Sequence, residues 1–257
     1  MALRKTRHQL IGLVVMLFSI ATYGQLAPKE DFSSWGWIQI EKQTFKHQYV
    51  SLQYQVRYDN YGFTFDRSNF YLGYGIDYFK KFNTEVVYQY STSYKKDEHT
   101  FFVGTTYKTK LFKKTALFFR TAVQHTQNYF TGDPIADKPL TEWRNRVRLS
   151  YSFNKQYSAT VSAEPYLAFD RIHPGHLSRI RYVSQLNYRY NKYHNLSLFY
   201  LVEPDVITYK TPKTDFVIGL TYSIKLPNKW KDFKKFYKPS NPDKDKDKEN
   251  DTKDSFN

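Results

Sequence analysis

Arginines at alternate positions are the residues of this chain whose type and spacing best suggest chemistry. Arg144, Arg146 and Arg148 occupy every second position within the segment 141–153, TEWRNRVRLSYSF. Because successive side chains of a strand point to opposite faces of a sheet, these arginines share one face. A guanidinium keeps its charge and pairs with a carboxylate through two parallel hydrogen bonds. The spacing therefore predicts a strand face that forms ion pairs or attracts anions.

Other charged residues fall on the polar faces of segments that alternate in the same way. If all these faces point into one lumen, the charged network comprises Asp77, Glu85, Arg120, Glu142, Arg144, Arg146, Arg148, Glu164, Arg179 and Arg181. In a small barrel such a network fills the interior and nothing is conducted. In a wider barrel the arginines form a constriction that prefers anions. A structurally filled lumen is the favoured interpretation, and a pore that prefers anions is kept as the alternative.

The opposite face of the segment 141–153 is apolar apart from Asn145, and includes Trp143, Val147 and Leu149. A period of two predicts a strand with one apolar and one polar face. About eleven segments share this pattern, many of them ten or more residues long. Strands of globular proteins typically have about five or six residues, whereas a tilted strand that crosses a bilayer needs about nine to eleven. Strand length therefore favours lipid as the environment of the apolar faces.

Short and long connections follow one another between these segments, as in outer-membrane barrels with short periplasmic turns and longer external loops. The short ones are 80–83, 154–156 and 191–195, and the long ones are 60–68, 128–140, 170–176 and 203–213. Bacterial barrels made of one chain have even strand numbers, so we expect ten or twelve strands and favour twelve. The predicted fold class is all-β, a transmembrane up-and-down antiparallel β-barrel of 10–12 strands.

The chain divides into four predicted regions. Residues 1–24 have the basic, apolar and small-residue parts of a secretory signal peptide, and residues 25–226 hold the outer-membrane barrel. Residues 227–238 space aromatic residues among lysines, and two interpretations stay open, an interfacial amphipathic segment and an irregular aromatic-rich end. Residues 239–257 have little to bury and predict a disordered charged tail. The predicted location is the outer membrane of a Gram-negative cell, reached by way of a cleaved signal peptide.

The composition narrows the function classes. The 257 residues include no cysteine, which excludes disulfides, thiolate metal sites and a cysteine nucleophile. The net charge of +15 is spread along the chain, with no nucleic-acid-binding motif. The predicted partners are therefore outer-membrane lipids with anionic headgroups, the barrel-assembly machinery during insertion and small solutes, but no nucleic acid.

No catalytic, cofactor-binding or metal-ligating residues are predicted. Nothing in the spacing of Ser150, Ser152 and His125 selects a catalytic triad, and the usual hydrolase, phosphate-loop and zinc-protease motifs are missing. His173 and His176, in HPGH, lack a third metal ligand in the sequence and are interpreted as parts of a turn.

The layout resembles a family of outer-membrane barrel proteins known as domain of unknown function 2490. The likeness covers roughly residues 30–226 and is carried by EWRNRVRLSYSF, SAEPYLAFD, SRIRYVSQLNYRYNKYHNLSLFY and the closing DFVIGLTYSIKL. It implies an outer-membrane β-barrel and no established activity, so it carries over no site residues.

The resulting interpretation is a porin-like barrel of unknown specific role, either a narrow pore or a filled structural barrel with a lumen lined by Arg and Glu. Two alternatives stay open. One is an outer-membrane barrel enzyme that hydrolyses lipid or peptide. The other is a soluble periplasmic lipocalin-like binder, because an apolar face that points inward has the same period as one that points outward.

Overall fold

The computed structural model describes residues 29–78, 81–94, 96–129, 139–169, 174–206 and 213–227. Within these ranges the chain forms eleven strands of 11 to 17 residues. They are β1 (Lys29–Phe45), β2 (Gln48–Asp59), β3 (Thr64–Tyr78), β4 (Phe82–Ser93), β5 (Asp97–Phe112), β6 (Thr115–Tyr129), β7 (Leu140–Ser152), β8 (Tyr157–Phe169), β9 (Pro174–Arg189), β10 (His194–Pro204) and β11 (Lys213–Leu226). Each strand reaches the length of about nine to eleven residues that a tilted strand needs to cross a bilayer.

Three of the predicted regions fall largely or wholly outside the described residues. The signal peptide (1–24) and the charged tail (239–257) lie entirely outside them, and the interfacial segment (227–238) is described only at its first residue. These three assignments therefore stay predictions. Among the described residues, the chain contains no helix with the length and apolar character needed to span a membrane.

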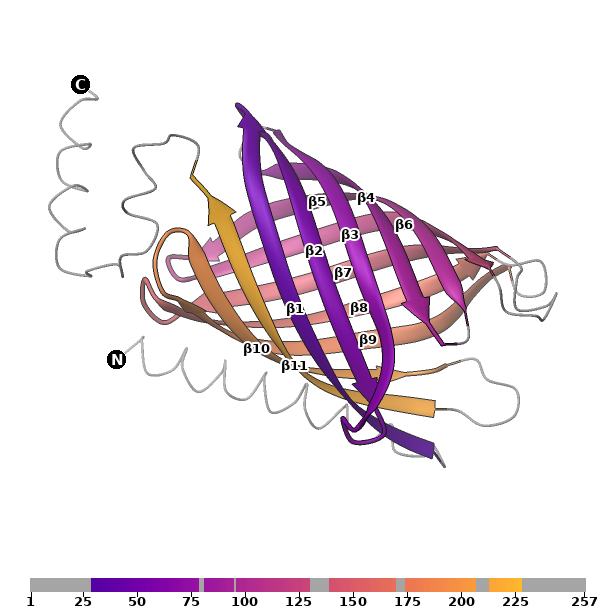
Figure 1. Cartoon of the computed structure of the whole chain (residues 1–257). Coiled ribbons are helices and arrows are strands. Elements are labelled where there is room, and N and C mark those ends of the chain that lie inside the picture. Colours follow the sequence, from indigo (N-terminus) through magenta and orange to yellow (C-terminus); the bar gives the residue numbers. More distant parts are fainter. Residues whose placement is uncertain are drawn as a thin grey trace, which may run out of the picture.

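The strands close into one barrel in the order of the chain, with β1 beside β11 (Figure 1). The other ten neighbouring pairs are antiparallel. The closing pair is parallel and places Lys29 opposite Lys213 and Lys42 opposite Leu226. The predicted up-and-down antiparallel barrel of 10–12 strands is confirmed. The number is eleven and not the favoured twelve, because an even number follows only if the first and last strands also pair antiparallel.

The two ends of the barrel differ in their connections. One end, here called the turn end, carries residues 46–47, 79–81, 113–114, 153–156 and 190–193. The other end, here called the loop end, carries residues 60–63, 94–96, 130–139, 170–173 and 205–212. The two longest connections, 130–139 and 205–212, are both at the loop end. Since the closing pair is parallel, β1 begins at the loop end and β11 finishes at the turn end.

One predicted long connection is wrong. Residues 60–68 were expected to form a loop, but β3 begins at Thr64, which pairs with Asp59 of β2. The chain reverses within four residues because Tyr61 and Gly62 have positive φ values of 59° and 84°. The polar residues that follow belong to β3, and this lengthens the first hairpin at the loop end.

Alternate residues of each strand face the interior, and contacts between strands that are not neighbours identify them. Arg179 of β9 reaches Glu142 of β7 across β8, with 2.9 Å between Nη2 and Oε2. Trp37 of β1 packs against Tyr71 of β3, with 6.3 Å between ring centroids. Side chains that meet across an intervening strand lie inside the barrel, so the polar face of the alternating pattern is the inner face.

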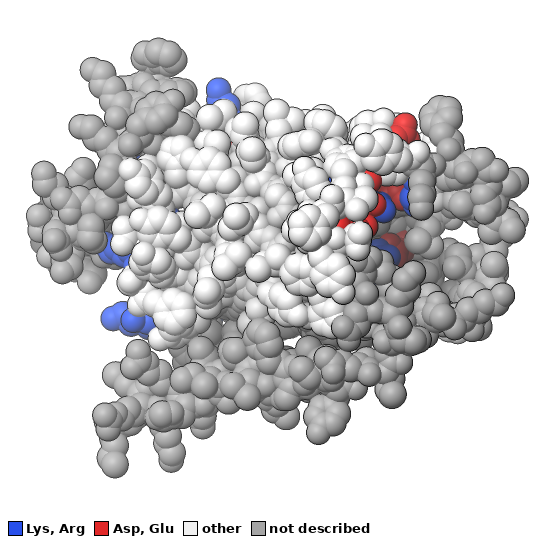
Figure 2. All heavy atoms as spheres, turned by 60° about the horizontal axis from the view of Figure 1, so that its bottom comes forward, with Lys and Arg blue, Asp and Glu red and all other residues white. Residues whose placement is uncertain are grey.

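The outward face is apolar around the barrel. It carries large apolar side chains that are each between 44% and 59% exposed, among them Leu52, Leu72, Val103, Phe119, Val147, Leu186, Leu198 and Leu220. Figure 2 shows one side of this face as a nearly uncharged surface, with Lys, Arg, Asp and Glu atoms gathered towards its two ends. An uncharged band between charged ends is typical of a barrel surrounded by lipid.

Part of the interior is also apolar. Phe199, Leu201 and Val217 form a buried cluster on β10 and β11, and Trp35 of β1 packs against it. A Cβ atom at Gly219 would overlap the Phe199 ring and lie 2.7 Å from the carbonyl oxygen of Trp35. Glycine is therefore needed at this position so that the Phe199 ring can lie flat against β11 inside the barrel.

Candidate functional site

The charged part of the interior is built on β7, β8 and β9. Arg144 donates from Nη2 and Nε to Oε1 of Glu164 at 3.0 and 3.1 Å. It also donates from Nη1 to Oε1 of Gln124 at 2.7 Å. Glu164 is 3% exposed, so this carboxylate is almost fully withdrawn from water. A buried carboxylate of this kind depends on the guanidinium that faces it.

Tyr166 lies at the centre of the arginines and is 1% exposed. The guanidinium carbons of Arg144, Arg179 and Arg181 lie 4.5, 4.2 and 5.3 Å from its ring centroid. A guanidinium within about 6 Å of an aromatic centroid is attracted by the ring quadrupole. The ring therefore separates three cations that would otherwise repel one another.

Two further glutamates neutralise the arginines of β9. Arg179 lies 2.9 Å from Oε2 of Glu142 and 3.6 Å from Oε1 of Glu203. Arg181 donates from Nε to Oε2 of Glu203 at 2.5 Å. Glu203 was missed at the sequence level because residues 203–213 were taken as a connection. Its inward neighbours on β10 are the apolar Phe199 and Leu201, so alternation of polarity gives no signal there.

Arg120 of β6 pairs with Glu85 of β4. Its Nη2 lies 2.7 Å from Oε1 of Glu85, and its guanidinium lies 4.2 Å from the Phe102 ring centroid. Arg120 is also the register partner of Arg146 on β7. Two arginines therefore stand directly opposite each other on the inner face, and among the described residues only Arg120 of the two forms an ion pair.

Arg146 and Arg148 make no ion pair with any residue that the structure describes. The guanidinium of Arg148 stacks on Phe118 at 4.0 Å from the ring centroid. The pairing of β7 with β8 passes from Arg144 opposite Tyr166 to Val147 opposite Ala163, and skips Arg146. The nearby Pro165 has no N–H group to donate to a ladder, which accounts for the gap. The inner face of β7 thus carries two arginines that have no ion pair of their own among the described residues, because Glu164, which also acts on Arg146, is hydrogen-bonded to Arg144.

Asp77 is set apart from the other nine predicted residues. It lies on β3 near the turn end and accepts a hydrogen bond from Nδ2 of Asn83 at 2.9 Å. The structure therefore brings nine of the ten predicted charged residues onto the inner walls of β4 and β6 to β9, and joins Glu203 to them.

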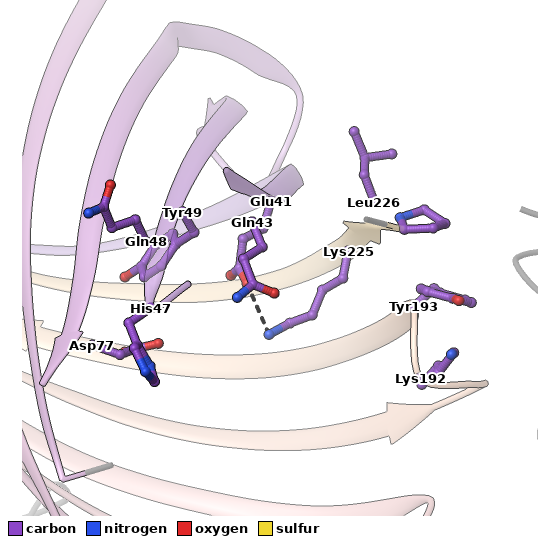
Figure 3. Close-up of a pocket in the computed structure, with 11 residues that line it drawn as sticks. Glu41, Gln43, His47, Gln48, Tyr49, Asp77, Lys192, Tyr193, Lys225 and Leu226 are labelled. Carbon is purple, nitrogen blue, oxygen red and sulfur yellow. Dashed lines mark ion pairs between the residues drawn. The ribbon is translucent and has the colours of Figure 1, made fainter. Parts of the chain in front are cut away.

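A cavity of about 390 Å³ opens at the turn end. Its lining includes Asp77, Tyr49, Glu41 and Lys225, and Figure 3 shows the last two pointing toward each other from neighbouring strands. Their Oε1 and Nζ atoms lie 3.1 Å apart. The cavity is lined by both signs of charge, so it has no marked preference for either kind of ion.

The described residues hold no cluster suited to a metal ion, and they do not bring His125 and Ser150 together. No group of three or more His, Asp or Glu among them could hold a metal ion. His176 is exposed, and His173 lies outside the described residues. His125 bonds Thr141 at 2.9 Å, whereas Ser150 meets Thr160, a residue of the inner face. His125 pairs with Thr141 of β7, and Thr141 and Ser150 are an odd number of positions apart on that strand. His125 and Ser150 therefore lie on opposite faces of the barrel wall.

Solved structures that match this chain include the following two. One is described as "Bacterial polysaccharide outer membrane secretin", with 8% identity and a TM-score of 0.47, over 68% of this chain and 74% of that chain. The other is described as "NanC porin structure in rhombohedral crystal form", with 12% identity and a TM-score of 0.46, over 76% of this chain and 99% of that chain.

No curated protein matches the sequence. A family model does, and it covers residues 32–204, from the first strand to the end of β10. Those residues include every member of the charged interior described above. The chain therefore belongs to the family "Protein of unknown function (DUF2490)".

Proposed function

We propose that the protein is an integral outer-membrane β-barrel whose lumen is filled by ion pairs and aromatic rings. The observation that carries this proposal is that the polar face of the strands points into the barrel and the apolar face points outward. The charged side chains point inward, and large apolar side chains such as Leu72, Val103 and Leu220 are about half exposed on the outside. In water such a continuous apolar surface would far exceed the patches that soluble monomers expose. In lipid it is the expected surface.

The same observation weighs against a soluble lipocalin-like binder. That fold would need the apolar face inside, around a ligand, and the charged face in water. Here the buried interior includes Gln55, Asn69, Glu142 and Glu164, each at most 3% exposed. A closed barrel also leaves no strand edge with unpaired backbone groups, which is the condition for crossing a bilayer with strands.

Filling of the lumen is supported at the loop end and in the middle of the barrel. Tyr166 is enclosed by three guanidiniums, and the Trp35 and Phe199 rings pack on the other side, with 6.4 Å between their centroids. These side chains leave little room for a wide channel. The role that follows is a structural barrel that resides in the membrane without an open channel.

A second candidate is a narrow pore that prefers anions. Arg146 and Arg148 favour it, because neither of them forms an ion pair with a carboxylate in the part of the chain that the structure describes. The cavity of about 390 Å³ at the turn end offers an entrance. An enzyme has no such support, since His125 and Ser150 lie on opposite faces of the wall.

The first experiment is gel migration of the membrane fraction in cold detergent, with and without boiling. A heat-dependent shift, together with recovery in the outer-membrane fraction, is the expected result. A soluble periplasmic protein without a shift would overturn the proposal. Planar-bilayer recordings on the folded protein then separate the two candidates, because a filled barrel gives no steps and an anion pore gives steps with a chloride-selective reversal potential.

A further inference from the structure

We propose that the lumen binds a small oxyanion, a carboxylate or a phosphate-like group, between Arg146 and Arg148, with Arg120 as a third donor. The inference rests on the proposed function in one respect, namely that the charged face is the interior of a folded barrel. It adds a ligand and the residues that hold it.

The first support is the placement of like charges. Arg120 and Arg146 are register partners on β6 and β7, and directly opposite residues have Cβ atoms about 4.5–5.5 Å apart. Arg148 is two positions further along the same face, a rise of about 6.8 Å. Three guanidiniums therefore reach into one region of the lumen. Like charges directly opposite each other are destabilising unless an anion lies between them.

The second support is the distribution of carboxylates. Glu85 is paired with Arg120 and Glu164 with Arg144, at 2.7 and 3.0 Å. Glu142 and Glu203 are paired with the arginines of β9. In the described part of the lumen, each of these carboxylates is thus already held by another arginine, and none forms an ion pair with Arg146 or Arg148. Arg146 and Arg148 are half-buried, and a cation that is partly withdrawn from water is costly to leave unpaired, so an anion from solution would stabilise them.

The third support is an unused donor. The Nε atom of Arg120 is buried and has no hydrogen-bond partner in the part of the chain that the structure describes. Buried polar groups of this kind are rare in folded proteins. Its Nη2 is already committed to Glu85. An oxygen atom placed between β6 and β7 would accept from the free Nε and from Arg146 together.

The aromatic rings beneath the arginines favour an oxyanion over a halide. Phe102 lies under Arg120 and Phe118 under Arg148, with 4.2 and 4.0 Å from guanidinium carbon to ring centroid. Stacking fixes the plane of each guanidinium. A planar fork held in this way matches the two oxygens of a carboxylate or phosphate, whereas chloride gains nothing from the planar geometry.

The turn end offers the route to this site. β7 runs from the loop end to the turn end, so Arg148 lies further toward the turn end, where the 390 Å³ cavity opens, than Arg146 does. The opposite half of the lumen is closed by Tyr166 and its arginines. A solute would therefore arrive from the turn end and meet Arg148 first.

The test uses the full-length protein folded in detergent and measures the temperature at which the heat-dependent gel shift occurs. Sodium phosphate and sodium acetate are titrated against sodium chloride at constant ionic strength. Both oxyanions are expected to raise the conversion temperature above that in chloride, in a saturable way. If the conversion temperature in phosphate and acetate is the same as in chloride, the proposed anion site is overturned. A protein with no heat-dependent shift overturns the proposed function instead.

Variants locate the effect. In the double variant R146Q/R148Q, the apparent affinity for phosphate is expected to fall by at least about tenfold. In chloride its conversion temperature is expected to rise, because removing the cations relieves their repulsion. R57Q is the matched control, since Arg57 also lies in the lumen, stacked on Trp35 at 4.0 Å and hydrogen-bonded to Gln55. It should keep the phosphate response.

Conservative variants guard against loss of folding. R146K and R148K keep the charge but lose the planar fork, so the preference for phosphate over chloride should shrink while the barrel still forms. A full phosphate response in R146Q/R148Q, or an equal loss in R57Q, would show that the anion acts elsewhere and would overturn the proposal.

Discussion

Arg179 and Glu142 form an ion pair across an intervening strand, with 2.9 Å between Nη2 and Oε2. The carboxylate of Glu142 is 1% exposed and also accepts hydrogen bonds from Ser178 and Gln124. This pair therefore links β7 to β9 through the interior rather than along the wall. The ion pairs of the interior therefore contribute to the free energy of unfolding of the barrel.

Replacing Glu142 by Gln should lower the free energy of unfolding by about 3–5 kcal/mol, because Arg179 would lose a buried counter-ion. The measurement is urea unfolding of the detergent-folded protein. Glu41→Gln is the control, since its partner Lys225 is 63% exposed. Exposed pairs of that kind contribute about 0–1 kcal/mol. Equal losses in the two variants would contradict a tightly packed charged interior.

The facing of β7 can be tested at two adjacent residues halfway along the strand. Val147 is 47% exposed on the outside, so Val147→Arg should reduce insertion by about 2–4 kcal/mol if it meets the middle of the bilayer. Arg146→Gln, on the inner face, should assemble normally. The amount of heat-shifting protein in the outer-membrane fraction measures both. Assembly of both variants at the parental level would mean that β7 faces the other way.

Gly219 should be intolerant of a side chain. A Cβ atom there overlaps the Phe199 ring and approaches the Trp35 carbonyl oxygen, so Gly219→Ala should cost about 1–3 kcal/mol through overpacking. Gly36→Ala is the matched control, because its Cβ would meet Val56 Cγ1 at an acceptable 3.4 Å. Urea midpoints of the two variants give the comparison. A neutral Gly219→Ala would show that the aromatic filling is looser than described.

Because the closing pair is parallel, the side of the membrane on which the chain continues after β11 can be predicted. If the turn end faces the periplasm, as short turns do in outer-membrane barrels, the chain after Leu226 continues in the periplasm. An epitope added at the C-terminus should then be hidden in intact cells and detected after permeabilisation. An epitope within 130–139, at the loop end, should be detected on intact cells. Detection of both on intact cells would contradict this orientation.

Much of the barrel wall could be predicted from the sequence, because alternation is a local property. The segment 141–153 shows its polar and apolar faces directly, and β7 spans Leu140–Ser152. The same signal identified the arginines of the interior. It needs only that one face is consistently polar and the other consistently apolar.

The closing pair and Glu203 could not be predicted in this way. The pairing of β1 with β11 joins residues at opposite ends of the barrel sequence, and nothing local sets its direction. On β10 the inward residues Phe199 and Leu201 are as apolar as the outward ones. The polar residues Asn195 and Ser197 mark the inner face only in the first half of β10, so a glutamate near the strand end is easily assigned to the loop that follows.

The seam between β1 and β11 also has a kinetic meaning. Its two strands are the farthest apart in the sequence, so their pairing has the largest chain-closure entropy to overcome and is expected to form late. Until then the protein is an open sheet with two unpaired edges. The arginines and glutamates of β6 to β9 lie in the middle of the chain, where hairpins form between neighbours in sequence. Their ion pairs can therefore assemble before the barrel closes and give the open sheet its curvature.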